Sequence, residues 1–192
     1  TAVGMQALRD LNAGATGNNV AVGHIAGRLM STGIQNTLIG ASAGDALTTG
    51  SDNVAIGHAA LTSDDVGSKS TAVGADALSS LNMSVATDTH NTAVGYQAGV
   101  SVSTGIHNTI IGSIAGDALT AADYNVALGK GALSTDVRGS RSTALGYEAL
   151  FAQNFSTATN TNNVAVGYNA GVAVTTGVDN TIIGGLAGDA IT

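Results

Sequence analysis

Residues of the types that usually carry chemistry are sparse in this chain. Its four histidines, at positions 24, 58, 90 and 107, show neither the His-x-His nor the His-x-x-x-His spacing of a local metal site. Glu148 is the only glutamate, which excludes a catalytic glutamate pair, and there is no cysteine. Phosphate-loop patterns are also absent. We therefore expect no enzymatic activity, no cofactor and no metal site; only a fold that stacks distant histidines would pair them.

Aspartate recurs at one constant interval in the sequence Ala-Gly-Asp-Ala, at Asp45, Asp117 and Asp189 (117 − 45 = 72 and 189 − 117 = 72). Carboxylates of this kind could hold a cation if the assembled protein brought them together. The favoured interpretation is simpler, namely that each aspartate caps backbone amides in a turn. The neighbouring pair Asp64 and Asp65 falls in a predicted loop, and we expect both side chains to be solvated.

Three aromatic residues, His24, Tyr96 and Tyr168, recur at the same interval as these aspartates. We expect them to form a sparse exposed row that could contact sugar rings, or else to be scattered surface residues. Tyr147 is expected to lie in a different register from this row.

Two Asn-x-Ser sequons begin at Asn82 and Asn154, again separated by that interval. They are glycosylation sites if the protein is secreted by a glycosylating cell, and polar loops otherwise.

The composition excludes several classes of protein. Hydrophobic residues make up 44% of the 192 residues but aromatic residues only 3%, so the buried units must be thin and numerous. The net charge is −7 with six lysines and arginines, which excludes a basic nucleic-acid-binding stripe and a polybasic membrane patch. No apolar run approaches the ~20 residues of a membrane span.

A phrase of the form Asn/Ser-Thr/Val-Ala/Ile/Leu-Val/Ile/Leu-Gly recurs along the whole chain. Most steps between its glycines equal that from Gly23 to Gly40 (40 − 23 = 17), two are longer (95 − 74 = 21), and the first is intermediate (23 − 4 = 19). We interpret residues 1–192 as a single elongated repeat domain and as an excerpt of a longer fibre. The closing glycines after Gly4 are Gly23, Gly40, Gly57, Gly74, Gly95, Gly112, Gly129, Gly146, Gly167 and Gly184.

This repeat predicts an all-β fold, a parallel β-solenoid of 17–21-residue coils, four of which make a 72-residue super-repeat. The step is too short for two-helix repeats, and the β-branched residues before each glycine favour a strand. A second strand is expected over the Ala-Leu segment after the glycine. Within each phrase, Thr and Val should face one way and Ala and Asn the other. Both sets are largely apolar, so one face should pack inside the coil and the other against another chain.

Two residues of the phrase have expected structural roles. The asparagines should stack as a hydrogen-bonded ladder along the solenoid. The closing glycine should supply a positive φ or a close backbone approach, so that Gly112→Val breaks a coil. The ladder asparagines are Asn36, Asn53, Asn91, Asn108, Asn125, Asn163 and Asn180.

Segments such as STAVGADALSS, NVAIGHAAL and NTAVGYQAG resemble the YadA-like head repeats of trimeric autotransporter adhesins, which also occur in bacteriophage tail fibres. The resemblance covers nearly the whole chain and implies a left-handed β-roll that forms a homotrimer along the fibre axis. Repeats of that family are commonly shorter than the steps seen here. No ligand motif is carried by the repeat phrase.

We therefore expect a non-catalytic structural or adhesive fibre segment, extracellular, on a bacterial surface or a virion tail fibre. Its expected partners are two further copies of the chain and a host-surface glycan or protein. The alternative is a soluble β-solenoid that binds glycans or ice.

Overall fold

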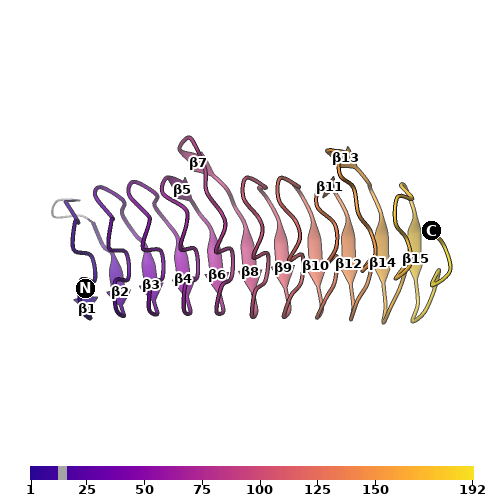
Figure 1. The fold of residues 1–192 in the computed structure, drawn as a ribbon, viewed down its shortest axis with the longest axis horizontal. Coiled ribbons are helices and arrows are strands. Elements are labelled where there is room, and N and C mark those ends of the chain that lie inside the picture. The colour runs from indigo at the N-terminus through magenta and orange to yellow at the C-terminus, as the bar shows by residue number, and fades with distance from the viewer. Residues whose placement is uncertain (13–16) are drawn as a thin grey trace.

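The computed structural model describes residues 1–12 and 17–192 and winds them into a solenoid whose rungs lie side by side along one axis (Figure 1). These residues form strands and turns but no helix, and each main-sheet strand pairs in parallel with that of the next rung. Thr37 pairs with Val54 and Val126 with Thr143, so these rungs advance by 17 residues. The expected all-β parallel solenoid is confirmed.

One eleven-stranded sheet runs the length of the solenoid. Its strands are short and rich in Thr, Val and Ile, whose branched side chains fit an extended backbone. They are β1 (Ala2–Val3), β2 (Val20–Val22), β3 (Thr37–Ile39), β4 (Val54–Ile56), β6 (Thr71–Val73), β8 (Thr92–Val94), β9 (Thr109–Ile111), β10 (Val126–Leu128), β12 (Thr143–Leu145), β14 (Val164–Val166) and β15 (Thr181–Ile183).

Two small sheets lie beside the main one. Strand β5 (Gly67–Ser68) pairs with β7 (Thr87–Asp88), and β11 (Gly139–Ser140) pairs with β13 (Thr159–Asn160). The two pairs occupy the same place in successive super-repeats. In Figure 1, β7 and β13 lie on loops that rise above the other rungs. These loops are the extra length of the two longest rungs.

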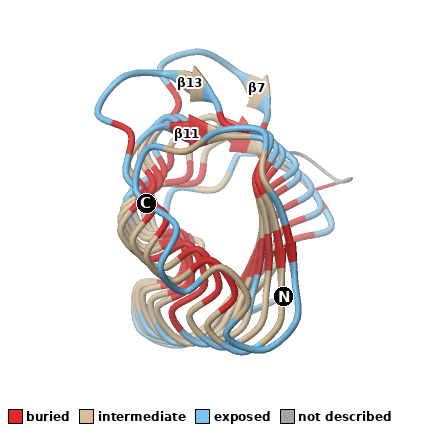
Figure 2. Cartoon of the chain, turned by 90° about the vertical axis from the view of Figure 1, so that its right-hand side faces the viewer, coloured by how far each residue is buried: buried red, intermediate tan, exposed pale blue. Residues whose placement is uncertain are grey.

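The middle residue of each three-residue strand in the main sheet points into the solenoid. Ala21 and Leu38 are fully buried, whereas Thr37 and Ile39 on either side of Leu38 are not. Asn36, which precedes that strand, is also buried. Ala and Asn therefore face the core and Thr and Val face outward, and Figure 2 shows the buried residues of successive rungs lying over one another.

The narrow core is filled by complementary volumes at two positions of the rung. Leu38 lies between two turn glycines, and a Cβ on Gly27 or Gly44 would come within 2.7 or 2.8 Å of its side chain. Some rungs with Ala in the strand carry a buried leucine in the turn, as Ala55 and Leu61 do. Others carry Gly in the turn, as Ala21 and Gly27 do, and there the side chains of adjoining rungs, such as Leu38, fill the space. Aliphatic side chains thus fill the core without aromatic rings.

The prediction of a second strand after each closing glycine is wrong. That segment is a turn in which two residues per rung have positive φ, such as Ala59 and Leu61, both at 53°. Positive φ bends the backbone out of the strand region, although the Leu61 N–H still donates to the Ala77 carbonyl at 3.0 Å. The sequence does contain a signal for this turn. The position of Leu61 is occupied by Gly in other rungs, and Gly adopts positive φ at no steric cost.

Candidate binding surface

The outward face of the main sheet carries continuous apolar ladders. The last residue of every strand in this sheet is Val, Ile or Leu. In-register pairing places Ile39 beside Ile56 and Leu128 beside Leu145. Ile39 and Leu128 are 38% and 47% exposed. This strip of aligned, partly exposed aliphatic side chains is a candidate interaction surface, because isolated proteins rarely expose long contiguous apolar patches.

The asparagines before the strands form an internal ladder. Asn36 Oδ1 accepts the backbone N–H of Asn53 at 2.9 Å, and Asn36 Nδ2 donates to the Gly50 carbonyl at 2.9 Å. Direct contacts between amides are longer, as from Asn108 Nδ2 to Asn91 Oδ1 at 3.3 Å. The ladder therefore joins side chains mainly to the backbone of the next rung. The Oδ1 atoms that accept in this way belong to Asn19, Asn36, Asn53, Asn91, Asn108, Asn125 and Asn163, and Asn180 donates its N–H to the last of them.

The closing glycines meet two steric requirements at once. Gly112 has φ of 134°, and a Cβ built on it would lie 2.5 Å from the Gly129 carbonyl oxygen. An L-residue there meets both a disfavoured backbone region and the next rung. All ten closing glycines after Gly4 have φ between 128° and 140°: Gly23, Gly40, Gly57, Gly74, Gly95, Gly112, Gly129, Gly146, Gly167 and Gly184.

The prediction that Asp64 is solvated is wrong. Its side chain is fully buried and Oδ1 accepts the N–H of Gly67 at 3.0 Å and of Met83 at 3.3 Å. Oδ2 is buried with no hydrogen-bond partner among the described residues. Burial raises the pKa of Asp64, against smaller opposing effects of the backbone N–H groups. Asp65 is half-buried at the surface of the same loop.

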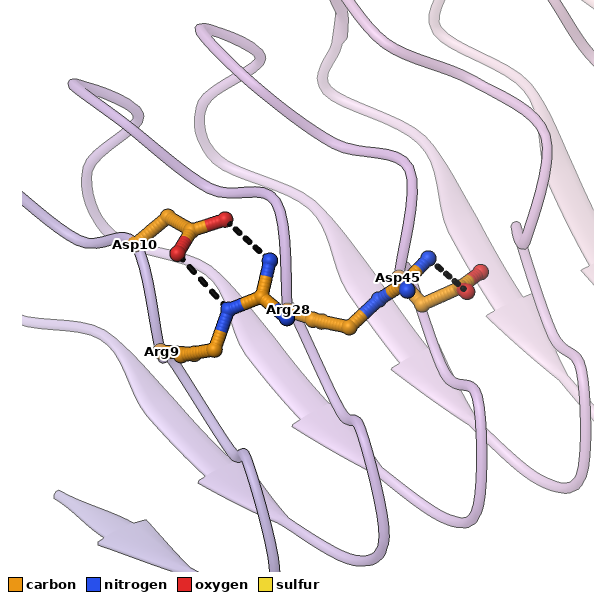
Figure 3. Close-up of polar contacts among 4 residues, drawn as sticks. All are labelled: Arg9, Asp10, Arg28 and Asp45. Atoms are coloured by element: carbon orange, nitrogen blue, oxygen red, sulfur yellow. Dashed lines mark hydrogen bonds and ion pairs between the residues drawn. The ribbon is translucent and has the colours of Figure 1, made fainter.

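Two of the three Ala-Gly-Asp-Ala aspartates, Asp45 and Asp117, accept hydrogen bonds from side chains of neighbouring rungs rather than from backbone amides of their own turn, so the prediction of a turn cap is wrong for them. Asp45 accepts a hydrogen bond from Arg28 Nη2 on one side at 3.4 Å (Figure 3). On the other side it accepts one from the Thr62 hydroxyl. Asp117 accepts in the same way from Ser134. These contacts connect rungs and form no cation site within the described part of one chain.

Near the two ends of the solenoid, the side chains of Asp10 and Asp189 do not connect rungs in this way within the described residues. Asp189 lies in the last rung and is exposed. In Figure 3, the Arg9–Asp10 pair lies on the rung next to Arg28, and the guanidinium of Arg9 lowers the pKa of Asp10. Because Arg9 and Asp10 are neighbours in the sequence, their pairing joins no two rungs.

The expected aromatic row is placed on one edge, immediately after the closing glycines, but its members do not touch. Tyr96 and Tyr168 are 53% and 57% exposed. The prediction for Tyr147 is wrong, because its ring stacks on Tyr168 with centroids 5.3 Å apart. Lys130 Nζ lies 5.6 Å from the centroid of Tyr147. Counting from the closing glycine, rather than by super-repeats, places Tyr147 and Tyr168 at the same position of successive rungs.

Sequence reasoning misses a second aromatic row. His90, His107 and Tyr124 each precede a ladder asparagine and each has positive φ, of 50°, 59° and 60°. The ring of His107 stacks on His90 at 5.2 Å and on Tyr124 at 5.0 Å, between centroids. The signal is present in the sequence, since all three residues stand one position before the asparagines Asn91, Asn108 and Asn125.

The two sequon asparagines, Asn82 and Asn154, are exposed on the long loops. Among the described residues, no group of three or more His, Cys, Asp or Glu side chains is arranged to hold a metal ion, and no helix could cross a membrane. Comparison of the chain with family models, curated proteins and solved structures finds no match.

Proposed function

We propose that this chain is a non-catalytic segment of a trimeric fibre, structural or adhesive, displayed on a bacterial surface or a virion tail. The observation that carries the proposal is the apolar outward face of the eleven-stranded sheet. Every rung repeats it, so a second and a third copy laid alongside in register would meet the same aliphatic side chains at every level. The sequence resemblance to YadA-like head repeats supports this arrangement and a left-handed roll, and the repeated segments of the sequence support 72-residue super-repeats.

Burial of this face has the magnitude that stable assembly needs. Covering a single exposed Val, Leu or Ile contributes roughly 1.5–3 kcal/mol. Val22, Ile39, Leu128 and Ile183 expose between 36% and 69% of their surface, and other rungs contribute a partly exposed aliphatic residue. Each of these contributions is scaled down by the fraction of the side chain that is exposed, and their sum over the rungs is of the same order as the cost of association, which is about 4–15 kcal/mol.

The native mass in solution tests the proposal. Sedimentation should give a mass near three times the 18.6 kDa chain. The double variant Val94→Lys, Ile111→Lys places two charges on the outward face and should yield monomers. Val85→Lys is the matched control, because Val85 is an exposed aliphatic residue on a long loop. A monomeric wild-type chain, or a trimer indifferent to the double variant, would contradict the proposal.

A glycan contact at Tyr96 is a second candidate. The residues at the same position of the adjoining rungs are Ala75 and Ser113, so small side chains flank both faces of the exposed ring. Aromatic faces bind the apolar faces of sugars. Loss of binding on a glycan array in Tyr96→Ala, with binding retained in Tyr124→Ala, would support it; equal binding by both variants would oppose it.

Ice binding is not favoured by the outward face. The first strand positions alternate irregularly between Thr, as at Thr37 and Thr71, and Val, as at Val54 and Val126. A regular threonine array is therefore interrupted.

A further inference from the structure

The stacked histidine pair lies on the surface of the solenoid, outside the apolar face. His90 and His107 occupy the position before the ladder asparagine in successive rungs, and both are exposed. Their rings are nearly parallel, with 14° between the planes and 5.2 Å between the centroids. Because the rings meet by their faces, the nitrogens lie on ring edges that remain open to solvent.

The backbone beneath the pair is held in place from both sides. The His107 N–H donates to the Thr89 carbonyl at 2.8 Å, and the next amide, of Asn108, donates to Asn91 Oδ1 at 2.9 Å. On the far side the ring of Tyr124 covers His107 at 5.0 Å. Ligands held on rigid neighbouring rungs lose little conformational freedom on binding, which favours chelation.

The imidazole nitrogens of the pair are uncommitted. Within the described residues, no hydrogen bond or ion pair involves either side chain, whereas His58 lies 3.9 Å from the Asp76 carboxylate. The nearby Asp88 carboxylate is paired with Lys69. Neutral imidazole is a preferred ligand of copper, nickel and zinc, and metal–nitrogen bonds are about 2.0–2.1 Å long. Binding of a shared ion requires the two rings to turn out of their parallel stack, so that one nitrogen of each points at the ion.

We propose that His90 and His107 form a two-nitrogen binding site for a borderline divalent metal ion such as Cu²⁺, with water completing the coordination. The chain provides one such pair, since His24 and His58 have Ala or Met rather than His at the same position of the adjoining rungs. The net charge of −7 favours the approach of a cation. This inference does not depend on trimer formation, because both ligands come from one chain.

Calorimetric titration with Cu²⁺ alone, followed by electron paramagnetic resonance, tests the site. The variants are His90→Asn and His107→Asn, which should fold normally because Asn18 and Asn162 occupy the same position with positive φ. The controls are His24→Ala and His58→Ala, since Ala41 and Ala75 occupy that position in other rungs.

We expect one ion per chain with a two-nitrogen resonance signature. Each of the two Asn variants should weaken binding by about tenfold or more, and the two Ala controls should not. The site is refuted if the double Asn variant keeps the same affinity, if an Ala control weakens binding equally, or if the signature shows one nitrogen or none.

Discussion

The loops around Asp64 and Asp136 lie 72 residues apart (136 − 64 = 72), and one buried side chain in which they differ decides how each aspartate is hydrogen-bonded. Both aspartates are fully buried and both accept the N–H of a glycine three positions later, Gly67 or Gly139. Asp136 Oδ2 also accepts a hydrogen bond from Gln153 Nε2. The residue that corresponds to Gln153 in the first loop is Leu81.

The difference between Gln153 and Leu81 changes a network of buried hydrogen bonds. Gln153 also donates to the Ser142 hydroxyl and accepts from Asn163 Nδ2, each at 2.8 Å. In the first loop, Leu81 leaves Asp64 Oδ2 without a partner among the described residues. One loop therefore satisfies a buried carboxylate completely and the other keeps it half-satisfied, although both loops hold it by the same backbone amides. A single side chain thus decides whether a buried charge is supported.

The largest effect should come from removing the supported carboxylate. Asp136→Ala leaves the N–H groups of Gly139 and Phe155 and the Gln153 amide without their acceptor. We expect a loss of about 3 kcal/mol in the free energy of unfolding, measured by urea titration. Asp64→Ala should cost clearly less, because it also removes an unpartnered oxygen. Equal losses would mean that Gln153 contributes nothing.

Reciprocal exchange of the two side chains should give effects of opposite sign. Gln153→Leu leaves Asp136 Oδ2 without a donor and should destabilise by about 2 kcal/mol. Leu81→Gln supplies that donor to Asp64 beside Ser70 and Asn91, which match Ser142 and Asn163, and should stabilise by up to about 1 kcal/mol. The same urea titration measures both. Destabilisation by both variants would show that the two loops differ in shape as well as in chemistry.

The pH dependence of stability should differ in the same way. Burial raises the pKa of Asp64 in the folded chain above its unfolded value. The folded state is therefore favoured most below the unfolded pKa, and this contribution is lost as the pH rises through the folded pKa. Urea titration of wild type and of Asp64→Asn from about pH 3 to pH 8 measures this contribution, as the difference between their free energies of unfolding at each pH. When both proteins also carry Leu81→Gln, this difference should decline less as the pH rises, because the added amide donor stabilises the ionised carboxylate. An unchanged decline would contradict the role of the missing donor.

The smallest effect is expected at the surface. Lys69 pairs with Asp88 in the first loop, whereas the second loop has Arg141 and Asn160 at these positions. Asp88→Asn copies the second loop, and its melting temperature should equal that of wild type, because both side chains are exposed and solvent screens the pair. The pair lowers the pKa of Asp88, so a carboxyl titration by NMR should show that pKa rise in Lys69→Ala. A clear drop in melting temperature would make the ion pair structural.

Much of the fold follows from the repeated phrase, because its side chains alternate in a period of two. The grouping of Ala with Asn and of Thr with Val, and parallel rungs of nearly constant length, follow from that pattern. Which of the two sets faces the core does not follow from it, because both sets are largely apolar; the burial of Ala21 and Asn36 decides it. The second strand is a wrong prediction because apolar content alone does not separate a strand from a turn, and Leu61 and its equivalents pack inward with positive φ. Tertiary packing overrides the usual preference of leucine there.

The candidate binding surface and the buried loop residues are predictable only in part. The doubly apolar strands point to the outward face, yet the burial of Asp64 is missed because a polar residue in a loop is normally solvated. Its place in the rung is the one that Leu47 and Leu81 fill in adjoining rungs, so an alignment of rungs rather than of super-repeats would reveal it. The stacked histidines need the same alignment.

The bonds that join rungs run along the axis of the solenoid, as from the Thr37 N–H to the Asn53 carbonyl at 2.8 Å. A pull applied to the two ends acts parallel to these bonds and opens one pair of rungs before the next. Each ordinary rung that peels away releases about 55–60 Å of chain. Under tension the solenoid therefore lengthens in discrete steps, one rung at a time, and dissipates work at each step.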